Sequence, residues 1–536
     1  MPGSARSADR RSLPVLGAAA TPGGGAGASA HHRLPAGVRV AMITLGCDKN
    51  TVDSERLLGG LLGAGVEIAT TPEDADVVVV NTCGFIEMAK QESIDTLLEA
   101  ARLKEDGRVR AVVGMGCLVQ RYRTELEREM PEVDLFLGLT DADRLVPELA
   151  RRGLVGEAVP LMERPLRVLA GGPRHSAHLK ISEGCDHGCA FCAIPLMRGK
   201  FRSTPIDLLV REARELEAAG TVELNIVSQD TTWYGRDWAR ALARGRAPAV
   251  MGADGESYFL GRPFRGMPNV PASSGIAGGL RARDGEGPVR GGPIDLEGVD
   301  RTGALPLLLR TLLAETSIPW LRLFYMYPSG ITPELVALLA AEERLLPYLD
   351  MPIQHGSDTV LRRMRRPERR ATILERVGWL RAAIPGLALR TTVIAGFPGE
   401  TEDEFEELLG LVEEVGFDHM GAFAYSEEED TAAAAMADQV PEAVRRERLE
   451  RVLDLQRQIA LERNQARVGT RTPVLVDTVD GAGATARAPW QGPEVDGVVR
   501  IEAGAALRPG TILHVEITAA DEHELTAIPT EGERDG

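Results

Sequence analysis

Between residues 38 and 140, short apolar runs alternate with segments whose apolar residues recur at helical spacing. The runs that predict strands are 38–45, 76–82 and 110–116, and the segments that predict helices are 51–64, 87–103 and 119–129. Strands that alternate with helices favour a parallel sheet with right-handed crossovers. The pattern therefore predicts an α/β domain at this end of the chain.

A second series of the same kind begins near residue 177. Its strand-like runs are 177–182, 222–228, 321–326, 348–353, 389–395 and 419–425, with helical segments between them. Six β/α units predict an open or partial parallel barrel, smaller than the eight-stranded form. The stretch 141–176, which joins the two series, is predicted to be a linker with a short hairpin.

Three further stretches depart from the β/α pattern. Residues 236–300 contain 13 glycines and 6 prolines, a low-complexity composition that predicts an insertion after the second strand. Residues 436–469 form one charged helical segment, and 470–530 show β-like runs without helical period, which predicts a small β-barrel. The first 36 residues lack a sustained apolar core, so we expect a disordered tail there and not a signal peptide; 531–536 is a second short tail.

The net charge of −18 argues against a protein held mainly on nucleic-acid phosphates and suits a basic protein partner. No apolar run approaches the roughly 18 residues of a membrane helix, so we expect no membrane span. Six cysteines in a chain of 536 residues without a recognisable signal fit a reducing compartment, and we expect a cytoplasmic protein.

The six cysteines fall into two sets of three. Cys185, Cys189 and Cys192 form a tight C-x3-C-x2-C, whereas Cys47, Cys83 and Cys117 each follow a predicted strand of the first series. Strand ends of a parallel sheet share one edge, so the second set can converge there. Thiolates are the usual ligands of iron–sulfur clusters, and three of them leave one iron open. The alternatives are unrelated buried cysteines for the second set, and for the first a zinc site with His187 as fourth ligand.

Several longer motifs resemble the methylthiotransferase family of radical S-adenosylmethionine (SAM) enzymes. They are TLGCDKNTVDSE (44–55), NTCGFIE (81–87), GCLVQRY (116–122), LKISEGCDHGCAFCAIPLMRGKFRS (179–203), YLDMPIQHGS (348–357) and GFPGETEDEF (396–405). The resemblance implies a flavodoxin-like parallel α/β domain (37–145), a linker (146–176), a partial (βα)6 radical SAM barrel (177–435), a connecting helix (436–469) and a TRAM-like β-barrel (470–530). Asp48 stands where the family often has proline, and the 236–300 insertion is unusual.

Within this family the motifs favour the branch that modifies a ribosomal protein. The LGC-x-KN-x-VDSE and CAIPLMRG segments resemble that branch, while the tRNA branch usually begins with a GCQMN-like segment. Residues 470–536 hold 12 acidic side chains against 5 arginines, which suits a basic protein substrate better than tRNA. The resemblance implies methylthiolation of the β-carbon of an aspartate in small-subunit ribosomal protein uS12. The alternatives are a tRNA adenosine C2 methylthiotransferase and, more remotely, a non-catalytic iron–sulfur or zinc RNA-binding protein.

The resemblance also implies two [4Fe–4S] clusters, two SAM molecules per reaction and an electron donor such as flavodoxin or ferredoxin, with no strong binding of nucleic acid. Cys185, Cys189 and Cys192 would hold the SAM-binding cluster, and Cys47, Cys83 and Cys117 the cluster that carries or donates the sulfur. The residues expected to contact SAM are Phe191, Ser228, Gln229, Gln354, Arg390, Thr392 and Gly396. Thr401 and Glu404 match a capping box, which is a structural feature.

Overall fold

The computed structural model describes residues 37–157, 165–169, 172–243, 250–251, 257–259, 262–263, 303–481, 483–502 and 507–530. The two predicted tails and most of the predicted insertion lie outside these residues. The chain divides into two compact units: the first holds the residues up to Gly172 together with Leu196–Arg198, and the second holds the rest of the described chain. None of the described helices has both the length and the apolar character needed to cross a membrane.

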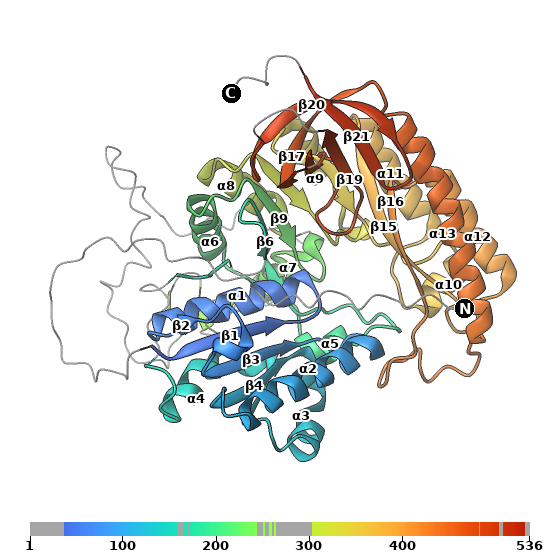
Figure 1. Ribbon diagram of the computed structural model, residues 1–536. Coiled ribbons are helices and arrows are strands. Elements are labelled where there is room, and N and C mark those ends of the chain that lie inside the picture. Colours follow the sequence, from blue (N-terminus) through green and yellow to red (C-terminus); the bar gives the residue numbers. More distant parts are fainter. Residues whose placement is uncertain are drawn as a thin grey trace. The chain divides into compact units, whose positions relative to one another are not determined.

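The first unit is built on a five-stranded parallel sheet in the order β2-β1-β3-β4-β5 (Figure 1). The strands are β1 (Arg39–Thr44), β2 (Glu67–Ile68), β3 (Val77–Thr82), β4 (Ala111–Gly116) and β5 (Leu135–Gly138). Every residue of β3 and β4 is buried, as expected for central strands covered on both faces. Val77 and Val79 join one apolar core and Val78 and Val80 the other, so the two-residue period of the strand separates two layers of helices.

The helices of this unit cover both faces of the sheet. They are α1 (Asp48–Gly63), α2 (Glu87–Glu105), α3 (Cys117–Glu129) and α4 (Leu145–Arg151). Leu58 of α1 and Leu149 of α4 belong to one core, whereas Leu97 of α2 and Leu126 of α3 belong to the other. The three strands and three helices predicted for 38–140 are confirmed. The hairpin predicted in 141–176 is wrong for the described part of that stretch, where α4 packs into the core instead.

The second unit contains a six-stranded parallel sheet in the order β6-β9-β13-β14-β15-β16. The strands are β6 (Ser176–Lys180), β9 (Glu223–Val227), β13 (Trp320–Leu323), β14 (Leu345–Asp350), β15 (Ala388–Ala395) and β16 (His419–Ala424). Its main helices are α6 (Ile206–Ala218), α7 (Arg236–Ala243), α8 (Leu305–Glu315), α9 (Pro333–Ala341), α10 (Asp358–Arg363), α11 (Arg370–Ala383) and α12 (Glu402–Val415). The short helix α5 (Ile194–Arg198) is divided between the units, and its residues Leu196–Arg198 belong to the first. The strands lie in chain order, which confirms the predicted open barrel of six β/α units.

Shorter elements interrupt this barrel. A two-stranded ribbon, β7 (Ser182–Glu183) with β8 (Arg202–Ser203), follows β6. Within the predicted insertion, α7 is a regular helix, and β10 (Val250–Met251), β11 (Ser257–Phe259) and β12 (Arg262–Pro263) pair as an antiparallel sheet. Trp238 of α7 is buried, so the departure from the barrel begins later than residue 236.

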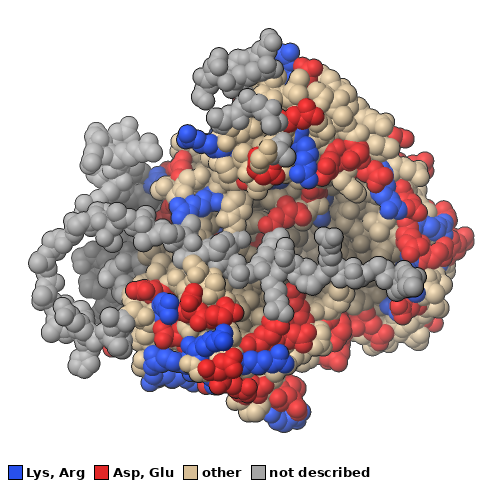
Figure 2. Space-filling view, in the orientation of Figure 1, with Lys and Arg blue, Asp and Glu red and all other residues tan. Residues whose placement is uncertain are grey.

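The C-terminal part of the second unit is a helix followed by a closed β-barrel. The elements are α13 (Glu442–Gln465), β17 (Arg471–Asp480), β18 (Gly483–Arg487), β19 (Val498–Glu502), β20 (Ile512–Ala520) and β21 (Glu524–Pro529), and the strands close in the order β17-β18-β19-β21-β20. The predicted small barrel is confirmed. Figure 2 shows acidic side chains interspersed with basic ones over α12 and α13, where Arg451 pairs with Glu402 and Glu406.

A buried ion network joins the closed barrel to the parallel sheet. Glu223 of β9 accepts hydrogen bonds from Arg322 of β13 at 3.0 Å and from Arg487 of β18 at 2.7 Å, and all three side chains are almost completely inaccessible to water. Arg487 also binds Asp477, which contacts His175. Burial alone would raise the pKa of Glu223, but the two guanidiniums hold that pKa below its usual value.

Glu223→Gln is therefore expected to destabilise the second unit by about 3–5 kcal/mol, because two buried guanidiniums lose the carboxylate between them. The measurement is the free energy of unfolding from urea denaturation. Glu524→Gln is the matched control, since Glu524 pairs with Arg500 at the surface and both side chains are about half exposed. If the two substitutions lowered the free energy of unfolding equally, burial would not be what makes the Glu223 contacts important for stability.

Candidate active site

The first cysteine set lies on the loop that follows β6 and the ribbon strand β7. Cys185 and Cys189 are buried and Cys192 is half-buried. The loop starts at Gly184, whose φ of 73° is left-handed; a Cβ there would lie 2.3 Å from the carbonyl oxygen of Lys200. Only glycine fits so close to another backbone segment, so this residue sets how the loop closes.

The three thiols of this loop are close enough to interact electrostatically. Burial raises the pKa of Cys185 and of Cys192 to about 12, and the neighbouring Cys189 adds to both shifts. A thiol must lose its proton to bind metal, so these side chains need a strong positive charge beside them to be thiolates. Three thiols in one loop thus fit a [4Fe–4S] cluster, whose irons would supply that charge.

Cys189 has a cation and a phenol beside its sulfur. Nη1 of Arg366 lies 3.9 Å and the hydroxyl of Tyr327 4.0 Å from Sγ of Cys189. The guanidinium of Arg366 is fully buried, stacks on the Tyr327 ring at 3.9 Å and pairs with Glu368 at 3.1 Å. Arg366 could not be identified from the sequence, because it stands between α10 and α11, far along the chain from any motif cysteine.

The proposed zinc ligand His187 is engaged elsewhere. Its Nε2 lies 2.7 Å from Oδ2 of Asp230, and its ring stacks between Tyr327 and Trp233, with centroids 4.1 and 3.9 Å away. Among the side chains that the structure describes, no three His, Cys, Asp or Glu residues are arranged to bind one metal ion. The contacts of His187 with Asp230, Tyr327 and Trp233 show what holds its ring in this structure, and the choice between zinc and an iron–sulfur cluster stays a prediction.

The second cysteine set converges at the C-terminal edge of the first unit's sheet. Cys47 precedes α1 and is exposed, Cys83 follows β3 and is buried, and Cys117 opens α3 and is buried. Burial raises the pKa of Cys117 to about 12, and both Cys47 and Cys83 add to the shift, so all three sulfurs are neighbours. The convergence predicted from three strand ends is thus present. Whether these thiols hold a cluster stays a prediction.

Two glycines of the motifs make this convergence possible. A Cβ on Gly46 would lie 2.9 Å from Sγ of Cys83, and a Cβ on Gly116 would lie 2.5 Å from the carbonyl oxygen of Thr82. Both glycines also have left-handed φ, at 91° and 104°. Each cysteine that follows such a glycine is brought against the neighbouring strand end only because no side chain intervenes.

Polar residues around the second set form one network. Asn50 of α1 accepts a hydrogen bond from Nη2 of Arg198 at 2.6 Å and lies 3.7 Å from the sulfur of Cys117. Arg198 also binds Asp53 at 3.1 Å, and its side chain is 1% exposed. Its positive charge lowers the pKa of both Cys83 and Cys117, opposing the larger effect of burial. Arg198 was not among the predicted site residues, although it is the penultimate residue of the CAIPLMRG motif.

Arg198→Met is expected to weaken iron binding by the second cysteine set, because it removes the cation that favours thiolates there. It should also cost about 3 kcal/mol of stability, since the buried oxygens of Asn50 and Asp53 lose this donor. The measurements are iron per chain after reconstitution and the urea midpoint. Arg198→Lys keeps the charge and is the control. Iron loading equal to that of the unmodified chain in the Met variant would contradict this role.

Three expected SAM contacts lie near the first cysteine set in the chain or at the end of β9. Phe191 is half-buried and packs against an apolar cluster that includes Met364 and Phe397. Ser228 is buried, and its hydroxyl hydrogen-bonds to that of Ser182. Gln229 is half-buried. Their contact with SAM stays a prediction.

The expected SAM contacts at the last strands are Gln354, Arg390 and Thr392, and their contact with SAM stays a prediction. Arg390 donates to Asp350 at 2.9 Å and pairs with Asp496 of the closed barrel at 3.4 Å, so its charge is already matched by carboxylates. Thr392 accepts at its carbonyl oxygen from the N–H of Gln354, whose φ of 71° is left-handed. Gln354 is thus a strained position at a strand end, which is common at ligand sites.

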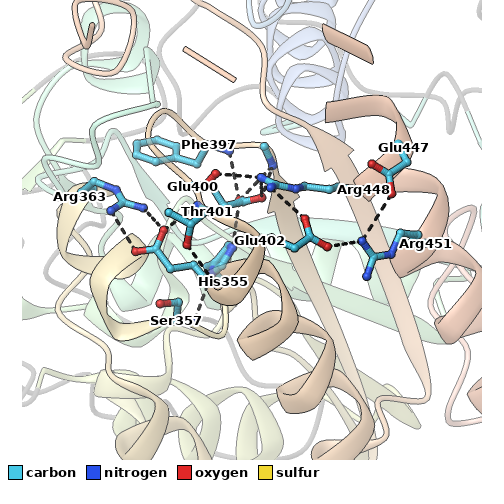
Figure 3. A network of polar contacts seen from close by, with 12 residues as sticks. His355, Ser357, Arg363, Phe397, Glu400, Thr401, Glu402, Glu447, Arg448 and Arg451 are labelled. Atoms are coloured by element: carbon cyan, nitrogen blue, oxygen red, sulfur yellow. Dashed lines mark hydrogen bonds and ion pairs between the residues drawn. The ribbon is translucent and has the colours of Figure 1, made fainter. Parts of the chain in front are cut away.

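Gly396 belongs to a turn that is held by Glu400, whose contacts with His355 and Arg448 are drawn in Figure 3. Its N–H donates to Glu400 at 3.0 Å, and a Cβ on it would lie 2.3 Å from Cγ of Arg445. Glu400 also lies 3.1 Å from Nε2 of His355 and binds Arg448 of α13 at 2.9 Å. The glycine is therefore required by α13; its contact with adenine stays a prediction. The capping box of Thr401 and Glu404, at the start of α12, is confirmed.

Three family models match the chain in consecutive segments. "Uncharacterized protein family UPF0004" matches residues 39–138, the radical SAM superfamily matches 179–256 and 298–412, and the TRAM domain matches 468–529. The gap in the radical SAM match falls inside the predicted insertion.

Curated relatives match nearly the whole chain. The ribosomal protein uS12 methylthiotransferase RimO of Desulforudis audaxviator (strain MP104C) is 42% identical, over 91% of this chain and 96% of its own. The enzyme of the same name from Anaeromyxobacter sp. (strain K) is 43% identical, over 91% and 92%. Among solved structures, the radical SAM methyltransferase TsrM of Kitasatospora setae aligns with a TM-score of 0.47 at 14% identity, covering 83% of this chain and 81% of its own.

Proposed function

This chain belongs to the radical SAM methylthiotransferases, among the ribosomal protein uS12 enzymes named RimO, and we propose that it methylthiolates the β-carbon of an aspartate in uS12. The observation that carries the proposal is the pair of three-thiol sets, one in each unit, in a chain that aligns with those enzymes over 91% of its length. One set suits radical generation and the other suits sulfur delivery.

The proposed substrate carbon explains why radical chemistry is needed. The β-carbon of an aspartate is not electrophilic, and its C–H bonds are not acidic. Neither a nucleophile nor a base therefore reacts with it readily. When bound, a [4Fe–4S] cluster with one open iron holds SAM and supplies the electron that breaks its sulfur–carbon bond. We propose two SAM molecules per turnover, one as methyl donor and one as radical source.

The chain's own residues would bind the two clusters and hold them in place. Cys185, Cys189 and Cys192 would hold the SAM-binding cluster, and the first two of these cysteines are buried. Arg366 would balance the negative charge that Cys189 carries as a cluster ligand, because its guanidinium lies 3.9 Å from that sulfur and has no exposure to water. The second set, Cys47, Cys83 and Cys117, would hold a second [4Fe–4S] cluster that carries or donates the sulfur.

The excess of acidic side chains at the C-terminal end of the chain supports a basic protein as substrate. Residues 470–536 carry 12 acidic and 5 basic side chains. Asp477 and Asp496 point inward, to Arg487 and Arg390, but Asp480, Glu502 and Glu522 remain exposed on the closed barrel. Such a surface attracts a basic ribosomal protein and repels tRNA phosphates. We further propose a cytoplasmic enzyme, reduced by flavodoxin or ferredoxin.

The experiment is the intact mass of uS12 from cells with and without this gene. A methylthio group on one aspartate, lost when Cys185, Cys189 and Cys192 are replaced, is the expected result. An unchanged uS12 together with gene-dependent methylthioadenosine in tRNA would overturn the substrate and retain the chemistry. Purified protein with one zinc, no sulfide and no SAM cleavage would overturn the enzyme assignment.

A further inference from the structure

An arginine-lined cavity opens beside the loop that carries the first cysteine set. Its volume is about 650 Å³, and it lies entirely within the second unit. The lining residues are Asp186, His187, Gly188, Trp233, Arg236, Ser329, Arg362, Arg365, Arg366, Pro367 and Arg369. Five of them are arginines and one is acidic, in a chain whose net charge is −18. The cavity is therefore a strongly positive place on an acidic protein.

Asp186 is already neutralised, whereas Arg362 and Arg365 at the mouth have no carboxylate partner among the described residues. Asp186 pairs with Arg240 at 2.8 Å. The exposed Arg362 donates only to Asp358 O and to the Thr359 hydroxyl of its own helix, and no ion pair joins it or Arg365 to any residue that the structure describes. Neighbouring arginines differ, since Arg363 pairs with Glu404.

The backbone at the mouth is strained in a way that presents one of these arginines. Arg365 has φ of 57°, a left-handed conformation that costs a residue with a Cβ about 1–3 kcal/mol. Its side chain is exposed and lines the cavity. The left-handed turn at Arg365 ends α10, because the N–H of Arg366 donates to the carbonyl oxygen of Leu361 at 2.8 Å.

One residue of the cavity lining, Arg366, also contacts the first cysteine set. Arg366 lines the cavity, and its Nη1 lies 3.9 Å from the sulfur of Cys189. His187 and Gly188, which also line it, stand between Cys185 and Cys189 in the chain. A group seated in the cavity would therefore lie close enough for electron transfer to a cluster on these cysteines.

We propose that this arginine face, defined by Arg236, Arg362, Arg365 and Arg369, docks an acidic electron-transfer protein that reduces the SAM-binding cluster. The inference rests on the proposed function. One electron passes from the reduced donor to the cluster, so the donor is oxidised by one electron and no proton or leaving group moves. A basic substrate is repelled by the same charges and is left to the acidic surfaces of the closed barrel, so donor and substrate do not compete.

The test compares the reconstituted full chain with its Arg362→Gln/Arg365→Gln variant, using a flavodoxin as the probe. Calorimetric titration at low salt should show roughly tenfold weaker flavodoxin binding by the variant, and a shallower dependence of binding on salt. Cluster reduction by flavodoxin should slow likewise, while SAM cleavage driven by dithionite, which needs no docking, should not change. Arg310→Gln is the matched control, because Arg310 pairs with Glu334 on other helices.

Two outcomes overturn the proposal. One is flavodoxin binding by the variant as tight as that of the unmodified chain. The other is binding of a ribosomal RNA fragment that the double substitution abolishes while flavodoxin binding is kept, which would assign the face to nucleic acid. Failure of the proposed function is seen separately, because the unmodified chain would then not cleave SAM even with dithionite.

Discussion

Cys189→Ala will abolish SAM cleavage, because a cluster that needs three cysteine thiolates cannot be held by the two that remain. The substitution removes the sulfur beside Arg366 and Tyr327 and leaves Cys185 and Cys192 as the remaining ligands. We expect no deoxyadenosine above background from the dithionite-reduced protein, and iron content to fall from about eight to about four per chain. The measurements are chromatography of the SAM products and iron analysis of the reconstituted protein.

The folding control for this variant is its urea midpoint, which should change little because alanine fills most of the volume of the thiol. The second unit's ion network around Glu223 is untouched by the change. Deoxyadenosine formation at even a tenth of the rate of the unmodified chain would show that Cys189 is no cluster ligand. The assignment of the C-x3-C-x2-C loop would then be wrong.

Cys83→Ala will leave SAM cleavage intact and abolish methylthio transfer. Cys83 is buried against Gly46 and belongs to the set on the first unit's sheet, so the C-x3-C-x2-C loop keeps all its ligands. We expect deoxyadenosine at nearly the rate of the unmodified chain, but no mass increase of uS12. Iron should again fall by about four per chain.

The two cysteine variants are matched controls for one another, since each removes one ligand from one set. Loss of both activities in Cys83→Ala would indicate a folding defect, which the urea midpoint detects. Methylthio transfer at the full rate in Cys83→Ala would contradict the second cluster, and the three convergent thiols would then be ordinary buried cysteines.

The elements that carry both cysteine sets could be predicted because their signals are local. Apolar runs such as VVVV at 77–80 predict buried central strands, and the position of a cysteine just after such a run places it at the sheet edge. The capping box of Thr401 and Glu404 is likewise contained in four residues. Very short elements could not be predicted in this way, because their patterns are too short. The strand β2 has two residues, and α4 has seven within a stretch of mixed composition.

The side chains that complete the sites could not be predicted, because their roles depend on contacts between distant segments. Arg366 reaches Cys189 across 177 residues of chain, and Arg198 reaches Asn50 across 148. Arg390 is a further example. Its pairing with Asp496, more than a hundred residues later, could not be read from the strand pattern, and its contact with SAM stays a prediction.

The buried network of Glu223, Arg322 and Arg487 bears on how substrate preference can change in evolution or in the laboratory. A terminal barrel that meets its neighbour through an apolar patch can be exchanged between homologues as a cassette. Here the barrel brings Arg487 to a fully buried carboxylate of another layer. A transplanted barrel lacking that arginine would leave Glu223 undercompensated. Chimaeras between branches of the family should therefore keep both sides of this contact from one parent, and recombination inside it should be disfavoured.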